Sequence, residues 1–94
     1  MSSYRLSKAA ENDLIQIAEY GDEQFGITQS NKYRDQFKRR FILIAKQPLF
    51  FPEINHIHEG YRRSVCGSHS IYYKIEKEHV LIVRILGRQD LNTL

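Results

Sequence analysis

The chain has 94 residues, of which 41% are hydrophobic and 27% are charged, and its formal net charge is +3. This apolar content suffices for one small core, so we expect a single domain over residues 1–94. The charge is lower than that of a dedicated nucleic-acid-binding protein, the lone cysteine excludes an internal disulfide, and no apolar run is long enough to cross a bilayer.

The first residues predict a short strand and then a helix. Residues 4–6 alternate in polarity, and Ser7 stands where its hydroxyl can accept a hydrogen bond from the first helical turn. Apolar residues with helical spacing mark one face: Ala10, Leu14, Ile17, Ala18 and Gly21. Polar residues lie largely off this stripe, namely Glu11, Asp13, Gln16 and Glu19. Gly26 is predicted to end the helix.

A second helix is predicted after Gly26, with Thr28 or Ser30 as its N-cap. Its apolar stripe consists of Tyr33, Phe37, Phe41, Ile44 and Ala45. Basic residues occupy the other faces, including the run Lys38–Arg40, which we interpret as a solvated surface. Pro48 should stop this helix, because proline forces the residue before it out of the helical region. The two helices therefore form a hairpin with one shared apolar side.

The last third of the chain predicts strands. Residues 48–60 have no periodicity and are expected to form a loop, whereas residues 61–66, 68–76 and 79–86 alternate or are rich in β-branched and aromatic residues. Turns are expected at Gly67-Ser68 and at residues 76–78. The predicted fold class is α+β, in the order β-α-α-β-β-β, with the helical hairpin packed on one face of a small antiparallel sheet.

Strand alternation makes a prediction about the last strand. Leu81, Val83 and Ile85 should point to one face of the sheet, and Val80, Ile82, Arg84 and Leu86 should point to the other. Arg84 would then lie on a mixed basic and apolar surface of the kind that binds a partner. An alternative is that Arg84 pairs with Glu76 or Glu78 across the hairpin and keeps the sheet soluble.

Three stretches together carry a family resemblance: "YRLSKAAENDLIQIAEY", "GYRRSVCGSHSIYYKIE" and "VLIVRILGRQD". In order and spacing they resemble the ParE toxins of the RelE/ParE superfamily of bacterial toxin–antitoxin modules. The resemblance implies the same arrangement of strands and helices and a toxin that is silenced by a cognate antitoxin. It also implies one of two activities, because RelE-type relatives cut messenger RNA on the ribosome and ParE-type relatives inhibit DNA gyrase.

The residues favour the second activity. RNA cleavage needs groups that move protons and cations that stabilise the phosphorane charge. RelE-type relatives carry a Tyr or His close to the C-terminus, but neither residue follows His79 here. His69 and Tyr73 could carry protons, although such residues are more often structural members of a sheet. Arginine is a poor proton donor, because it hardly titrates. We therefore predict no catalytic residue.

A zinc site is the other chemistry to weigh. His56, His58, Cys66 and His69 are acceptable ligand types, but their spacing matches no standard zinc motif. A turn at Gly67 would also send Cys66 and His69 along different strands. We expect neither a metal nor another cofactor.

The predicted function is that of a cytoplasmic toxin that inhibits DNA gyrase and is neutralised by its antitoxin, with no membrane partner and no sequence-specific nucleic-acid binding. The alternatives are a ribosome-dependent endoribonuclease and a family member that has lost toxicity. The candidate target-binding residues are Arg62, Arg84, Arg88 and Asp90. Phe50 and Phe51 are the candidate antitoxin-binding residues, because two adjacent aromatic residues in a loop are hard to bury together.

Overall fold

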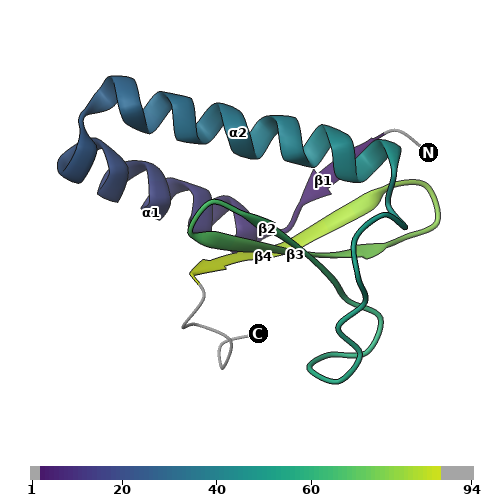
Figure 1. Ribbon diagram of the computed structural model, residues 1–94. Helices are drawn as coiled ribbons and strands as arrows, with labels where there is room; N and C mark the ends of the chain where they lie inside the picture. The colour runs from purple at the N-terminus through teal and green to yellow at the C-terminus, as the bar shows by residue number, and fades with distance from the viewer. Residues whose placement is uncertain (1–2, 88–94) are drawn as a thin grey trace.

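The computed structural model describes residues 3–87 and has the predicted α+β order of elements. Their bounds are β1 (Tyr4–Leu6), α1 (Lys8–Phe25), α2 (Ile27–Lys46), β2 (Arg62–Cys66), β3 (His69–Ile75) and β4 (Val80–Gly87). The two helices lie side by side over one face of the sheet, and the loop between α2 and β2 extends away from them (Figure 1). Within residues 3–87, neither helix is long and apolar enough to span a bilayer.

The helix boundaries follow from the residues at their ends. The Ser7 hydroxyl accepts a hydrogen bond from the backbone N–H of Ala10 at 3.0 Å, so the predicted cap of α1 is confirmed. Gly26 ends α1 with a φ of 85°, a backbone conformation that favours glycine. The predicted caps of α2 are wrong, because Gly26 joins the two helices alone and is itself the N-cap of α2. Ser30 lies inside α2, where its hydroxyl donates to the carbonyl of Ala18.

The sheet has the strand order β1-β4-β3-β2 and is mixed. The three strands β2, β3 and β4 form the predicted antiparallel meander, but β1 pairs in parallel with β4, with Tyr4 opposite Val80 and Leu6 opposite Ile82. The prediction of a wholly antiparallel sheet is therefore wrong at this one edge. After the helical hairpin the chain enters the sheet at β2, the edge opposite β1, and the meander then brings β4 beside β1 in a parallel direction.

A β-bulge in β4 changes which side chains share a face. The register passes from Tyr73 opposite Ile82 to Tyr72 opposite Arg84, so Val83 is skipped. As a result Ile85 joins Val80 and Ile82 in the core beneath the helices. The predicted alternation, which placed Ile85 on the opposite face from Val80 and Ile82, is wrong beyond this bulge.

Two clusters of buried side chains lie in the fold. The larger one includes the predicted α2 residues Phe37, Phe41 and Ile44. It also contains two residues of β3 and three of β4, namely Ile71, Tyr73, Val80, Ile82 and Ile85. A smaller one consists of Ile54, Tyr72 and Leu86, with Tyr61 packed against it. Because Ile54 belongs to the loop between α2 and β2, this loop is held to the sheet by its own small core.

Candidate functional site

Arg84 is held by a carboxylate of α1. Its Nε and Nη2 atoms donate to the two oxygens of Asp13 at 2.8 and 2.9 Å, a two-point contact that suits the planar guanidinium. The predicted alternative, a pair with Glu76 or Glu78, is wrong: Glu76 pairs with His79 at 2.9 Å and lies 3.6 Å from Lys74.

Asp13 also completes the edge of β4. Strand β1 pairs with β4 as far as Ile82, and α1 and its cap take over from there. The Ser7 hydroxyl donates to the carbonyl of Val83 at 2.6 Å, and Asp13 accepts the backbone N–H of Ile85 at 2.9 Å. Because a buried backbone group without a partner is costly, these side chains replace the missing strand neighbour. This explains why Asp13 is buried, although its helical position predicted an exposed residue.

A groove runs along α1 beside this ion pair. One hollow, of about 370 Å³, is lined by Asp13, Gln16, Ile17, Tyr20, His69, Arg84, Ile85, Leu86 and Gly87. A second, of about 200 Å³, lies between the C-terminal half of α1 and the N-terminal half of α2, and Ile17 and Tyr20 line both hollows. We call the two together the α1 groove. Arg84 thus lines a concave surface while it is paired, with 27% of its side chain exposed. Arg88 and Asp90 lie outside the described residues.

Tyr33 of α2 fixes the turn between β2 and β3 next to the α1 groove. Its hydroxyl accepts the backbone N–H of Ser68 at 3.0 Å and lies 2.8 Å from Nδ1 of His69. Burial raises the pKa of Tyr33 above the usual value for a phenol. The periodicity of α2 predicted Tyr33 as a core residue, and it gave no sign that the hydroxyl reaches His69.

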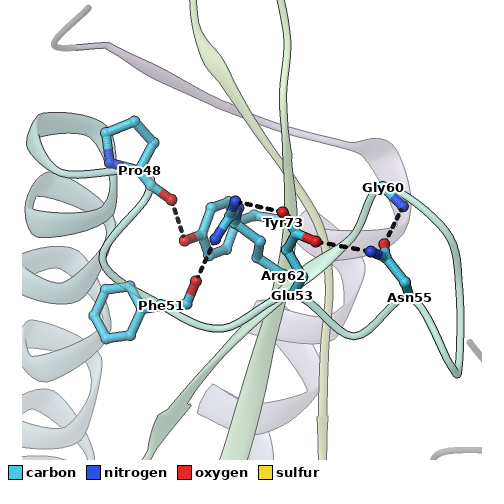
Figure 2. Close-up of polar contacts among 7 residues, drawn as sticks. All are labelled: Pro48, Phe51, Glu53, Asn55, Gly60, Arg62 and Tyr73. Atoms are coloured by element: carbon cyan, nitrogen blue, oxygen red, sulfur yellow. Dashed lines mark hydrogen bonds and ion pairs between the residues drawn. The ribbon is translucent and has the colours of Figure 1, made fainter.

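Arg62, the other described target-binding candidate, anchors the loop between α2 and β2 (Figure 2). Its guanidinium donates to the carbonyl of Phe51 at 2.7 Å and to the carboxylate of Glu53 at 2.8 Å. Glu53 in turn accepts from Asn55, and Asn55 accepts the backbone N–H of Gly60. Arg62 lies on the edge strand β2, and β3 separates it from Arg84 on β4. The structure therefore does not bring these two candidates together.

Tyr73 belongs to the same anchor. Its ring is fully buried, and its hydroxyl donates to the carbonyl of Pro48 at 2.6 Å, as Figure 2 shows. Burial raises the pKa of Tyr73 to about 12. A phenol that is buried, hydrogen-bonded and this weakly acidic is poorly suited to exchange a proton with a substrate.

The two adjacent phenylalanines differ in exposure. Phe51 packs against the core, with its ring perpendicular to that of Tyr73 and the guanidinium of Arg40 5.6 Å from its centre. Phe50 is 69% exposed. The expectation that the two rings could not both be buried is confirmed, and only Phe50 offers most of its ring to a partner.

Three of the four residues considered for zinc have other contacts. Cys66 is buried against the core, His58 stacks on the ring of Tyr61, and His69 contacts Tyr33. Within residues 3–87, no group of three or more His, Cys, Asp or Glu side chains is arranged to hold a metal ion.

Comparisons of the sequence and of the structure with known proteins agree with one another. Residues 4–92 match the profile of a family described as "ParE toxin of type II toxin-antitoxin system, parDE". Toxin ParE1 of Caulobacter vibrioides is 33% identical over 92 residues, which cover 98% of this chain and 94% of that protein. Toxin ParE1 of Mycobacterium tuberculosis is 29% identical over 89 residues, covering 94% and 91%. A solved chain titled "Chromosomal ParDE TA system from P. aeruginosa" superposes with a TM-score of 0.77 at 18% identity, over 93% of this chain and 96% of that one, and so shares its fold.

Proposed function

The chain belongs to the ParE toxin family of type II toxin–antitoxin systems, and from this premise we propose that it inhibits DNA gyrase by binding and not by catalysis. In this proposal a cognate antitoxin neutralises it, and both proteins act in the cytoplasm, where gyrase is found. No metal or cofactor takes part.

The observation that supports the non-enzymatic part is that three residues which RNA cleavage could use are engaged in internal hydrogen bonds. Arg62 holds a loop, Arg84 holds Asp13, and the Tyr73 hydroxyl is buried against Pro48. Cations committed in this way cannot move freely toward a phosphate, and a phenol with a pKa of about 12 does not act as a base at neutral pH.

We assign the contact with gyrase to the end of the α1 groove that Arg84 lines. Arg88 and Asp90 follow Gly87, which lines the same hollow, and they are the further candidates. Arg62 contributes indirectly in this proposal, by shaping the loop that follows α2.

Two assays with the purified toxin separate the candidate activities. We expect inhibition of gyrase-catalysed supercoiling and no cleavage of messenger RNA on translating ribosomes. Arg88→Glu should weaken the inhibition about tenfold or more, which corresponds to roughly 1.4 kcal/mol, and Arg5→Glu on the exposed part of β1 is the matched control. Ribosome-dependent cleavage by the wild-type toxin would instead support the endoribonuclease. A folded toxin inactive in both assays would support the member that has lost toxicity.

A further inference from the structure

A tyrosine and a histidine are joined across the α1 groove. Tyr33 lines the hollow between the two helices, and His69 lines the larger hollow together with Arg84. The Tyr33 hydroxyl lies 2.8 Å from Nδ1 of His69, and the centre of the fully buried Phe37 ring lies 5.8 Å from the centre of the imidazole. Two side chains of α2 therefore hold the His69 ring in place.

The contacts of the Tyr33 hydroxyl determine which nitrogen of His69 carries a proton. A phenol has one proton to donate and lone pairs that accept. One lone pair accepts the backbone N–H of Ser68 at 3.0 Å. Two acceptors compete for the proton, Nδ1 of His69 at 2.8 Å and the carbonyl oxygen of Cys66 at 3.2 Å. Hydroxyl donors usually lie about 2.5–3.0 Å from an acceptor oxygen, so the Cys66 contact is long and His69 is the better placed acceptor.

This hydrogen bond fixes the tautomer of the imidazole. A neutral imidazole has one donor nitrogen and one acceptor nitrogen, and the hydrogen bond at one nitrogen decides the state of the other. When Nδ1 accepts the Tyr33 proton, the hydrogen of the ring lies on Nε2. Nε2 is on the opposite edge of the ring from Nδ1, so its N–H is directed away from Tyr33. His69 thereby becomes a hydrogen-bond donor of fixed direction in the hollow that Arg84 also lines.

We propose that Tyr33 is a positioning residue, which sets His69 as a hydrogen-bond donor to a carbonyl or carboxylate of gyrase in the α1 groove. The proposal rests on the proposed function in taking gyrase as the partner. It adds the chemistry of recognition and the residue that prepares it, since a donor that is fixed before binding loses less entropy in the complex. A protein carbonyl or carboxylate suits this hollow better than DNA phosphates do, because Asp13 balances the charge of Arg84 there.

NMR of the histidine rings in the isotope-labelled toxin tests the tautomer directly. Spectra are recorded at about pH 8, where imidazoles are ordinarily neutral, and the His69 signals are identified by their absence from the His69→Gln variant. We expect the proton on Nε2 in the wild type and a mixture of both tautomers in Tyr33→Phe. Tyr4→Phe is the matched control, because it removes the same hydroxyl from another partly buried tyrosine of the same core, and it should leave the tautomer unchanged. A proton on Nδ1 in the wild type, or an unchanged tautomer in Tyr33→Phe, would overturn the proposal.

Inhibition of gyrase-catalysed supercoiling tests the contact, after circular dichroism has shown that each variant is folded. Tyr33→Phe should weaken inhibition about fivefold, as expected for the loss of one neutral hydrogen bond. Glutamine and asparagine at position 69 form a matched pair, because the amide nitrogen of glutamine reaches the place of Nε2 and that of asparagine reaches only the place of Nδ1. His69→Gln should therefore inhibit about fivefold more strongly than His69→Asn. Equal inhibition by these two variants would show that His69 donates nothing to gyrase and would refute the contact.

Two further outcomes separate this inference from the proposed function. A wild-type toxin without effect on gyrase would refute the proposed target and the contact with it, whereas the NMR spectra would still decide whether Tyr33 sets the tautomer. If the toxin instead bound duplex DNA in the absence of gyrase, and His69→Asn weakened that binding, the acceptor would be a phosphate. The contact with a carbonyl or carboxylate of gyrase would then be wrong.

Discussion

Replacing Asp13 with alanine tests how α1 is joined to β4. The carboxylate accepts three hydrogen bonds, two from Arg84 at 2.8 and 2.9 Å and one from the backbone of Ile85 at 2.9 Å. Alanine would leave the Ile85 amide buried without its acceptor, which costs about 1–3 kcal/mol. It would also remove the Asp13 carboxylate from the Arg84 guanidinium, and breaking a buried ion pair costs about 3–5 kcal/mol. Because 27% of the Arg84 side chain is exposed, water recovers part of this cost. We expect a total of about 3 kcal/mol.

Urea denaturation of the purified toxin measures this loss directly. Glu76→Ala is the control, because Glu76 pairs with Lys74 and His79 near the surface and its loss should cost less than about 1 kcal/mol. A double-mutant cycle with Asp13→Ala and Arg84→Gln then separates the ion pair from the bond to the Ile85 amide, which Arg84→Gln leaves intact. If Asp13→Ala costs no more than the Glu76 control, the contacts of Asp13 do not stabilise the fold.

The ion pair also determines how the role of Arg84 in gyrase binding can be tested. Arg84→Glu would place two carboxylates together beside β4, so a loss of toxicity would report a damaged fold as readily as a lost contact. Arg84→Lys keeps the positive charge beside Asp13 and removes the planar fork. It is therefore the better variant for the gyrase assay.

Three further predictions concern the turns and the loop. Gly67→Ala should lower stability by about 1–2 kcal/mol in thermal unfolding, because Gly67 has a φ of 62° and a Cβ there would lie 2.5 Å from the Tyr33 ring. Gly60→Ala is the control and should cost less, because a Cβ at Gly60 would contact no other atom. Burial raises the pKa of Tyr73 from 10.0 to about 12. The stability that the protonated phenol contributes is therefore complete below pH 10 and is lost as the pH rises through 12. Tyr73→Phe should remove this alkaline loss, as measured by the urea midpoint between pH 9 and 12. Arg62→Ala should speed proteolysis within residues 52–60 about tenfold, as expected when a charged hydrogen bond worth roughly 1.5 kcal/mol is lost, and unchanged cleavage would contradict its role as an anchor.

Much of the fold could be predicted because its signals are local. The Ser7 cap, the helix stop at Gly26 and the turn at Gly67 each depend on a few adjacent residues. The apolar stripe of α2 has a period that any packed helix must show, and its residues are buried as expected. The order of elements and the fold class follow from these local signals.

The candidate site was harder to predict, because its contacts are not local. Asp13 and Arg84 are 71 residues apart, and they meet because β1 ends early and leaves the edge of β4 to α1. Neither the parallel pairing of β1 nor the β-bulge at Val83 has a signature in the alternation of β4. Without the bulge, strand alternation places the Ile85 side chain on the face away from the core. The sequence pattern then gives no reason to expect that Asp13 accepts a hydrogen bond from the Ile85 backbone.

Arg84 shows how these errors combine. Its position in an apolar strand indicated an exposed cation with a binding role, and the observed hollow agrees that it borders a surface. Its pairing with Asp13 adds a structural role that the sequence pattern does not indicate, since Asp13 lies off the apolar stripe of its helix. A buried carboxylate that binds both a side chain and the adjacent strand backbone fixes the orientation of that side chain. Arg84 is thereby held in place at the rim of the α1 groove. In the proposed contact with gyrase, this lowers the entropy that is lost when the side chain becomes ordered on binding.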